Sequence, residues 1–353
     1  MSKHVRKILP KFRPTMEDVA REAGVSLSTV DRVLNVRANV RADTAQRIAA
    51  AAAQLGFHAK SVIEHRILND RPTIRLGFLL QKSGVAFYQG LAQALSNAAA
   101  TCAGARIQVA IGYLDDLDPA TVAQRILALR QQVDGLGVVA VDHPVVREAV
   151  AKLRDGGVSV VALISELSTA AGAGYVGVDN RLMGRTAGWF ITRLAAPGAA
   201  AVMVSSQRFQ CQELCEFSFR SYLADQSGDW ELLASRLTLE NDEFAYGNTM
   251  DLLAGEPDLV GLYIAGGGIA GVVRALREHK VQQARLPEVI CHDLTPLTRE
   301  ALKGGLVQAI LSHPVESVAA QAVSALVEGV KYGSMGVVAR VMLPIQLNVP
   351  ESL

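Results

Sequence analysis

Residues 15–35 read Thr15-Met-Glu-Asp-Val-Ala-Arg-Glu-Ala-Gly-Val-Ser-Leu-Ser-Thr-Val-Asp-Arg-Val-Leu-Asn35, and this stretch decides the fold of the first part of the chain. Thr15 can cap a helix whose first turn carries two carboxylates, where they interact favourably with the positive end of the helix. Gly24 then permits a tight turn, and Ser26 can cap a second helix. The stretch therefore predicts two short helices joined by a glycine turn.

This arrangement is a helix-turn-helix, whose second helix fits the major groove of DNA with its first turn at the base edges. A third helix, from residue 42 or 43 to Leu55, would complete its small core. The second helix leaves four side chains pointing outward: Leu27, Ser28, Thr29 and Arg32. Hydroxyls can bond bases or phosphates, a guanidinium can reach guanine or phosphate, and leucine can contact a thymine methyl. A helical hairpin packed on the rest of the chain would carry the same pattern.

The charge of the chain helps to separate these two interpretations. Residues 1–66 carry a net charge of +6, and the remainder of the 353-residue chain carries −5. A basic head on a mildly acidic body suits binding of a polyanion at one end only. Together with the outward hydroxyls and Arg32, this charge favours a DNA-binding head over a packed hairpin.

Beyond residue 72 the pattern changes to short apolar runs that alternate with longer amphipathic stretches. Strands are expected at Thr73–Leu80, Arg106–Ile111, Gly135–Val141, Val158–Ile164, Tyr175–Val178, Ala200–Val204, Ser235–Leu239, Val260–Ala265, Glu288–Cys291, Val307–Leu311 and Val341–Leu347. Helices are expected at Phe87–Ala100, Thr121–Gln132, Val145–Arg154, Met183–Leu194, Gly271–Glu278 and Val315–Val330. Such alternation predicts parallel sheets covered by helices on both faces, and so many strands fit two lobes better than one open sheet. The predicted fold class is an all-α helix-turn-helix head joined to an α/β body of two doubly wound parallel-sheet lobes.

Composition excludes several classes of protein. Half of the residues are apolar and 20% are charged, which rules out global disorder. No apolar run reaches the roughly 18 residues of a membrane-spanning helix, and the basic N-terminus lacks the apolar core of a signal peptide. We therefore expect a cytoplasmic protein with no membrane partner. The four cysteines and seven histidines lack zinc-site spacing, so neither a metal nor a cofactor is expected.

Two patterns raise an enzymatic alternative. The run Gly266-Gly-Gly-Ile-Ala-Gly271 fits G-x-G-x-x-G after an expected strand, and Asp293 follows the next strand, in the order of a dinucleotide site. The spacing to Asp293 is long for such a site, and the run falls late in the chain. Ser205 and Ser206 lack the glycine frame of a hydrolase nucleophile. The chain is thus expected not to be an enzyme, and a sugar- or dinucleotide-binding protein without a DNA-regulatory role is kept as the alternative.

The stretch quoted first closely resembles the DNA-binding domain of LacI/GalR-family transcriptional regulators in its spacing, its turn glycine, its closing Asn35 and its Val-Ser, Thr-Val and Arg-Val pairs. Residues 177–187 resemble the segment in which that family crosses between its lobes. The family's body is of the periplasmic-binding-protein-like type I and binds sugars. The resemblance implies a repressor that binds a palindromic operator in double-stranded DNA as a homodimer, under the control of a carbohydrate or polyol effector.

The resemblance also implies roles for single residues of the head. Leu27, Ser28 and Arg32 would read bases. Three further residues would mainly contact the DNA backbone: Thr15, Thr29 and Asn35. Asp31 stands where many members of the family have serine, which places a carboxylate near the phosphates.

The domains follow from the same resemblance. We expect a helix-turn-helix domain at 13–57, a hinge at 58–71, and an effector-binding and dimerisation domain at 72–353. Within the last domain we expect an N-lobe at about 72–178 plus 312–332 and a C-lobe at about 179–311 plus 333–353.

The hinge departs from the family pattern. Members of the family carry a short helix that wedges a leucine between base steps in the minor groove. Here Ala59 and Lys60 replace the usual Pro-Asn, and Arg66 occupies the wedge position. Ile63 or Ile67 could act as the wedge, or Arg66 could lie in a narrowed groove. A plain connecting helix is the alternative.

Effector contacts are expected in the loops after strands, because open parallel sheets bind ligands outside the carboxyl ends of their strands. The strand ends give Phe87, Tyr88, Asp142, His143 and Asp293, the family resemblance adds Cys215 and Ser312, and Phe244 is also expected. Aromatic rings can stack on sugar carbons, and carboxylates accept hydrogen bonds from hydroxyls. Phe87 could instead belong to a core, and Asp142 or Asp293 could cap a helix.

Several expected effector positions differ from the family. Cys215 stands where an arginine is common, Ile264 and Ala265 where an asparagine is usual, and Ser312 where a glutamine is frequent. These changes point to an effector that is smaller, less polar or otherwise unlike a common hexose, or to a lost response. Cys211 and Cys215 would lie one turn apart on a helix, which leaves thiol sensing open.

Overall fold

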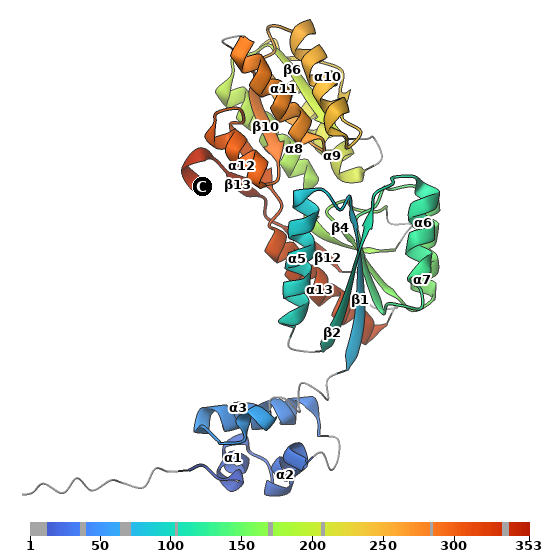
Figure 1. Cartoon of the computed structure of the whole chain (residues 1–353), viewed down its shortest axis with the longest axis vertical. Coiled ribbons are helices and arrows are strands. Elements are labelled where there is room, and N and C mark those ends of the chain that lie inside the picture. Colours follow the sequence, from blue (N-terminus) through green and yellow to red (C-terminus); the bar gives the residue numbers. More distant parts are fainter. Residues whose placement is uncertain are drawn as a thin grey trace, which may run out of the picture. The chain divides into compact units, whose positions relative to one another are not determined.

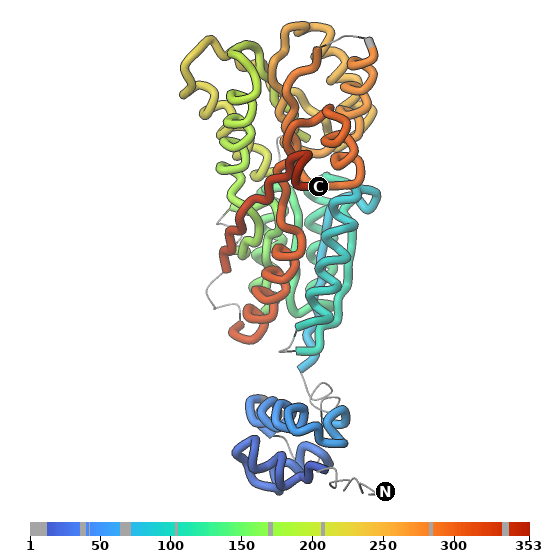
Figure 2. The backbone as a smooth tube through the Cα atoms, turned by 90° about the vertical axis from the view of Figure 1, so that its left-hand side faces the viewer, coloured from blue at the N-terminus to red at the C-terminus, as the bar shows by residue number. Residues whose placement is uncertain are grey.

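The computed structural model describes residues 13–35, 40–63, 72–102, 105–168, 172–205, 209–282, 285–333 and 339–353. Contacts divide the chain into a head, within residues 1–73, and a body that holds all but four of the residues from 74 to 353 (Figures 1 and 2). In the part of the chain so described, no helix has the length and apolar character needed to span a membrane.

Among its described residues the head has the helices α1 (Met16–Ala23), α2 (Leu27–Asn35) and α3 (Ala42–Leu55), and residues 60–63 are also helical. A capping box opens α1, in which the Thr15 hydroxyl accepts the Asp18 backbone N–H and the Asp18 carboxylate accepts the Thr15 N–H. Gly24 ends α1 with a φ of 63°, in the left-handed region. The Ser26 hydroxyl accepts the Thr29 N–H at the start of α2. Local capping therefore sets the turn between the two helices.

The core of the head lies where the three helices meet. Val19 of α1, Val30 of α2 and Ile48 of α3 are fully buried, and Phe57 and Ile63 complete the cluster. A unit of this size buries little apolar surface, so each of these side chains contributes a large share of its stability.

The N-terminal lobe of the body is built on a six-stranded sheet. Its strands are β1 (Thr73–Gln81), β2 (Arg106–Leu114), β3 (Gly135–Val138), β4 (Ser159–Leu163), β5 (Gly174–Val178) and β12 (Arg340–Leu343), in the order β12-β5-β4-β3-β1-β2. The five strands from β12 to β1 run parallel. Helices α5 (Ala86–Ala100) and α13 (Val315–Tyr332) cover one face, and α6 (Pro119–Ala128) and α7 (Pro144–Asp155) cover the other (Figure 1).

The C-terminal lobe repeats this plan. Its strands are β6 (Ala199–Val204), β7 (Glu231–Leu232), β8 (Arg236–Leu237), β9 (Gly261–Ile264), β10 (Glu288–His292), β11 (Ala309–Ser312) and β13 (Gln346–Asn348), in the order β13-β11-β10-β9-β6-β7, with β8 also on β6. Only β13 is antiparallel among the described pairings. Its helices are α8 (Asn180–Leu194), α9 (Gln210–Ala224), α10 (Asp242–Gly255), α11 (Ile269–Gln282) and α12 (Pro296–Lys303), and a 3-10 turn spans Pro350–Ser352.

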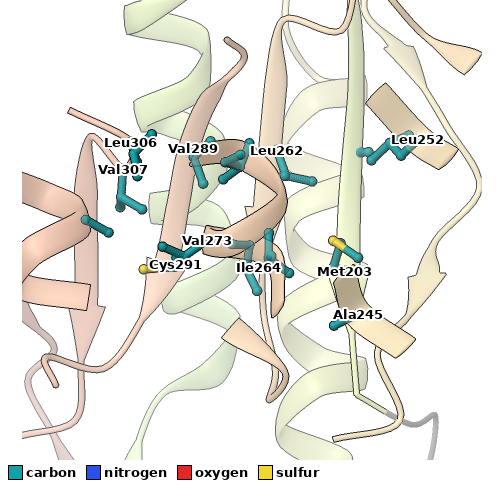
Figure 3. Close-up of a cluster of buried hydrophobic side chains, with 14 of the residues drawn as sticks. Met203, Ala245, Leu252, Leu262, Ile264, Val273, Val289, Cys291, Leu306 and Val307 are labelled. Carbon is teal, nitrogen blue, oxygen red and sulfur yellow. The ribbon is translucent and has the colours of Figure 1, made fainter. Parts of the chain in front are cut away.

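Two apolar layers hold this lobe together. On one face, Leu262 and Val289 of the sheet pack with Leu252 of α10 and Val273 of α11 (Figure 3). On the other face, α8 and α9 pack on the sheet around Phe219. Both faces of the central strands are thus buried, which explains why their sequences are continuous apolar runs.

The predicted fold class is confirmed, and the structure corrects two details. The expected single strand Val341–Leu347 is two strands, β12 and β13, which belong to different sheets. The strand β12 pairs in parallel with β5, so residues 340–343 belong to the N-terminal lobe and not to the C-lobe, where 333–353 was expected. Pro344 lies between the two strands and cannot continue the hydrogen-bond ladder.

The contact between α8 and α9 depends on Gly184. A Cβ atom at this position would lie 2.1 Å from the carbonyl oxygen of Cys215, closer than any real contact. We expect Gly184→Ala to lower the free energy of unfolding of the body by about 1–3 kcal/mol, because backbone atoms of both helices would have to move. Gly90→Ala in α5 is the matched control, since nothing lies within 4 Å of its added Cβ.

Urea unfolding of the two variants tests this packing. The control should be neutral or stabilised by up to about 1 kcal/mol, since alanine is the better helix former. Equal stability of the two variants would contradict the close approach of α8 and α9.

Candidate functional site

One face of α2 is open to solvent. Leu27 is 42% exposed, and Ser28 and Arg32 on the same face are also exposed. The Thr29 hydroxyl lies 2.8 Å from that of Ser26, so it is partly engaged in the turn. The sequence predicts these outward positions, and the structure shows Leu27, Ser28 and Arg32 exposed on this short helix.

Two other predicted DNA contacts have partners within the head. The side chain of Thr15 belongs to the capping box of α1. The Asn35 amide donates to the Asp31 carboxylate at 2.6 Å. This bond gives the unusual carboxylate of α2 a hydrogen-bond donor on its own helix.

The expected hinge is only partly described. Arg66 and Ile67 lie outside the described residues. Ile63 has no exposed surface and packs in the core of the head. In this structure Ile63 therefore stabilises the head and is not available to a DNA groove, which corrects its assignment as a minor-groove contact.

A cleft of about 330 Å³ lies between the two lobes of the body. Phe87 and Tyr88, at the start of α5, line it from the N-terminal lobe. Cys215 of α9 lines it from the C-terminal lobe, together with Asp293 after β10 and His313 after β11. As predicted, the lining lies at the carboxyl ends of the strands, in the loops that follow them and in the helices that these loops lead into.

Asp293 and His313 form a buried pair in this cleft. The Asp293 Oδ1 accepts hydrogen bonds from the backbone N–H of His313 and from its ring Nδ1, both at 2.9 Å. Burial alone would raise the pKa of Asp293, but the electrostatic interaction with the His313 ring and these hydrogen bonds outweigh burial and lower it. Asp293 is therefore ionised at neutral pH, and its φ of 58° is in the left-handed region.

The histidine before Asp293 behaves differently. The ring Nε2 of His292 lies 2.6 Å from the Tyr263 hydroxyl, and both side chains are buried. Burial lowers the pKa of His292 to about 4. The ring is therefore neutral at pH 7 in the folded protein.

We expect this buried ring to make stability fall in mild acid. Between pH 6.5 and 4 the unfolded chain takes up a proton on His292 that the folded chain does not, so folding weakens as pH falls through this window. The shift corresponds to a loss of about 3 kcal/mol by pH 4. Urea unfolding should show a flatter profile of stability against pH for His292→Gln than for the unaltered protein. Parallel profiles of His292→Gln and the unaltered protein would contradict the expectation.

Four of the eight predicted effector residues do not line the cleft. Asp142 binds Arg147 and the Ser168 N–H, both at 3.2 Å, and His143 caps α7 through the Val145 N–H. The prediction of effector contacts was wrong for Asp142 and His143, because both side chains hold the loop after β3 closed. It was also wrong for Ser312 and Phe244. The Ser312 hydroxyl is used by the Leu294 N–H and by Asn348, and Phe244 is 43% exposed outside the cleft.

The sequence missed several residues of the cleft. His313 follows an expected strand by two residues, and the strand-end rule could have found it. Glu240 and Asp242 follow β8, at the end of the expected strand Ser235–Leu239, so the same rule could have found them. Gln212 holds Ser205 through its side-chain oxygen, 2.8 Å from both the N–H and the hydroxyl.

The lobes are also joined beside the cleft by Lys82, after β1. Its ammonium donates to the carbonyl oxygen of Glu240 at 2.6 Å. Both residues have positive φ, 28° for Lys82 and 54° for Glu240. This hydrogen bond links a residue of the N-terminal lobe to one of the C-terminal lobe.

The two cysteines of α9 are unsuited to thiolate chemistry. Burial raises the pKa of Cys211 to about 12 and raises that of Cys215 as well. Both thiols therefore stay protonated at neutral pH, which weakens the case for thiol sensing.

Comparison with known families decides the identity of the body. Residues 76–333 match the family of the periplasmic binding protein domain. The chain belongs to this family. Residues 15–60 match a second family, the bacterial regulatory proteins of the lacI family. The recognition made from residues 15–35 is thus confirmed, and neither match is to a family of enzymes.

Two curated relatives of this chain share one name. Catabolite control protein A of Priestia megaterium is 29% identical over 155 residues, which cover 44% of this chain and 45% of the relative. Catabolite control protein A of Streptococcus mutans is 32% identical over 122 residues, 35% of each chain. The chain thus matches less than half the length of these curated relatives.

Solved structures share the fold of the body. A solute binding protein of an ABC transporter from Burkholderia graminis, in complex with D-arabinose, superimposes with a TM-score of 0.72 at 20% identity, over 80% of this chain and 97% of that one. A periplasmic solute binding protein from Actinobacillus succinogenes, with bound D-allose, gives 0.70 at 18% identity, over 79% and 98%. At this identity the likeness shows a two-lobed periplasmic-binding-protein fold.

Proposed function

We propose that this chain is a sequence-specific, DNA-binding transcriptional repressor of the cytoplasm. The observation that carries the proposal is the exposed face of α2, with Leu27, Ser28 and Arg32, on a lacI-family head of net charge +6. A recognition helix with an apolar, a hydroxyl and a guanidinium side chain can read base edges in the major groove. Thr15, Thr29 and Asn35 would contact the DNA backbone beside it.

The repressor acts as a homodimer on a palindromic operator. One head covers only a few base pairs, so two heads on a two-fold site are needed for useful specificity. Arg66 or Ile67 of the hinge enters the minor groove between the half-sites. These contacts extend the readout beyond the two major-groove surfaces.

A small sugar-like effector, held in the cleft, controls operator affinity. Phe87 and Tyr88 offer aromatic faces to ring carbons, while Asp293 accepts hydroxyl hydrogen bonds and Cys215 adds an apolar wall. The effector shifts the population of lobe closure, and this changes the spacing of the paired heads. An effector that closes the lobes but leaves operator affinity unchanged at fixed salt would contradict this step.

Titration with random-sequence duplex DNA at several salt concentrations tests the DNA-binding part. A dimer that neutralises about 6–10 phosphates should lose about 10³- to 10⁵-fold in affinity between 50 and 200 mM salt. A full-length chain without salt-dependent binding would instead be a sugar- or dinucleotide-binding protein with no DNA-regulatory role.

A further inference from the structure

The charge of the interlobe cleft is one-sided. Glu240, Asp242 and Asp293 all line it, and its described lining includes neither lysine nor arginine. Lys82 lies nearby, but its ammonium binds the backbone carbonyl of Glu240 and not the carboxylate. An anionic ligand would therefore enter a cleft whose described acidic groups repel it.

Asp293 is paired with His313, but the carboxylates of Glu240 and Asp242 are weakly compensated. Among the described residues, no lysine or arginine forms an ion pair with Glu240, Asp242 or Asp293. Glu240 receives one long hydrogen bond, from Gln212 Nε2 at 3.4 Å. Carboxylates inside a cleft favour a cationic partner, and the attraction grows as water leaves.

A second, independent observation points to a ligand at this site. His313 is 4% exposed and lines the cleft, yet its Nε2 atom has no hydrogen-bond partner in the described part of the chain. Its Nδ1 is bound to Asp293, so in the neutral ring Nδ1 carries the hydrogen and Nε2 is an acceptor. A buried acceptor without a donor is costly, and a ligand N–H or O–H would satisfy it.

Aromatic rings complete the environment. Phe87 packs against the His313 ring with centroids 5.7 Å apart, and Tyr88 lies beside Phe87 at 5.1 Å. Burial, followed by the charge of Glu240, raises the pKa of Tyr88, so its phenol stays neutral. Electron-rich ring faces next to carboxylates are the combination that binds organic cations.

We propose that the cleft recognises a small molecule through a protonated aliphatic amine. The ammonium lies against Glu240 and Asp242, within reach of the faces of Phe87 and Tyr88, while Asp293 and His313 Nε2 accept hydrogen bonds from the rest of the molecule. A cleft of about 330 Å³ is at the small end of ligand sites, which limits the ligand to about the size of a monosaccharide. The inference rests on the proposed effector role of this cleft.

The probes distinguish two kinds of ligand that carry such an amine, amino sugars and linear amines. At pH 7, calorimetric titration of the full chain compares D-glucosamine, D-galactosamine and D-mannosamine with their parent hexoses and N-acetyl forms, and putrescine with 1,4-butanediol. At least one amine should bind about tenfold or more tightly than its neutral counterpart. If an amino sugar binds most tightly, the ligand class is an amino sugar. If putrescine binds most tightly, the ligand class is a linear amine.

Several results would overturn the inference. The inference is wrong if every neutral counterpart binds as tightly as its amine or more tightly. It is also wrong if glucose 6-phosphate or gluconate binds more tightly than the amines, or if no amine binds up to about 10 mM. Random-DNA titration of the same preparation is read separately. DNA binding without amine preference refutes the inference alone, and amine preference without DNA binding refutes the regulatory proposal alone.

A charge-removing variant tests which side chains are responsible. Glu240→Gln keeps the size of the side chain and the backbone bond to Lys82, and should weaken binding of the preferred amine by about tenfold while sparing its neutral counterpart. Glu148→Gln is the control, because Glu148 pairs with Lys152 on the surface of α7. Equal loss of amine and neutral binding in Glu240→Gln would mean a structural role for Glu240 and would contradict the assignment.

Discussion

An Ile48→Asp variant of the full chain should lose binding to both operator and random DNA, while its body unfolds at an unchanged temperature. Ile48 has no exposed surface and packs among Val19, Val30 and Phe57 at the centre of the head. An unpaired carboxylate at such a site costs several kcal/mol. A head of roughly 50 residues has about 3–8 kcal/mol of stability in total, so one such change is enough to unfold it.

Anisotropy titrations with labelled DNA and calorimetry of the same sample measure the two effects. Ala50→Asp is the matched control, since it adds the same charge to an exposed position of α3, two residues away. The control should keep most of its DNA affinity. Salt-dependent DNA binding by Ile48→Asp, with its head unfolded by circular dichroism, would show that the head is not the DNA-binding unit.

An Arg32→Ala variant should lose base preference more than general affinity. The operator is first selected by the unaltered protein from a pool of random duplexes. On that operator the variant should bind about 5- to 150-fold more weakly, which corresponds to about 1–3 kcal/mol for a guanidinium contact to guanine. Its affinity for random DNA should fall only by the amount that one positive charge contributes through its contact with phosphate.

Arg21→Ala provides the control for charge. Arg21 lies on α1, where its exposed guanidinium pairs with Asp18, so its removal takes away the same charge outside the α2 face. This variant should weaken operator and random DNA about equally. If Arg32→Ala did the same, Arg32 would contribute charge alone and the proposed base readout would be wrong.

Much of the fold could be predicted because its signals are local. The head is set by Thr15, Gly24 and Ser26, which act on their immediate neighbours, and the body by runs buried on both faces of parallel sheets. The pairing of β12 could not be predicted. Val341–Leu347 looks like one apolar run, and the two sheets that it joins are built from segments far away in sequence.

The cleft was predicted in part for a similar reason. Strand ends indicate where ligands bind, and this rule found Phe87, Tyr88 and Asp293. It could not tell which loop side chains are used by the protein itself. Asp142 and His143 follow β3 at equivalent positions, but their hydrogen bonds stabilise α7 and its loop.

The hydrogen bond from Lys82 to the backbone of Glu240 affects the free-energy difference between open and closed arrangements of the two lobes. Opening the two halves must break it, yet both partners hold left-handed backbone conformations that store about 1–3 kcal/mol each in residues other than glycine. Relaxation of these backbone angles on opening would offset part of the cost of breaking the bond and bring the open and closed forms closer in free energy. A ligand of modest affinity would then be enough to shift the population between them.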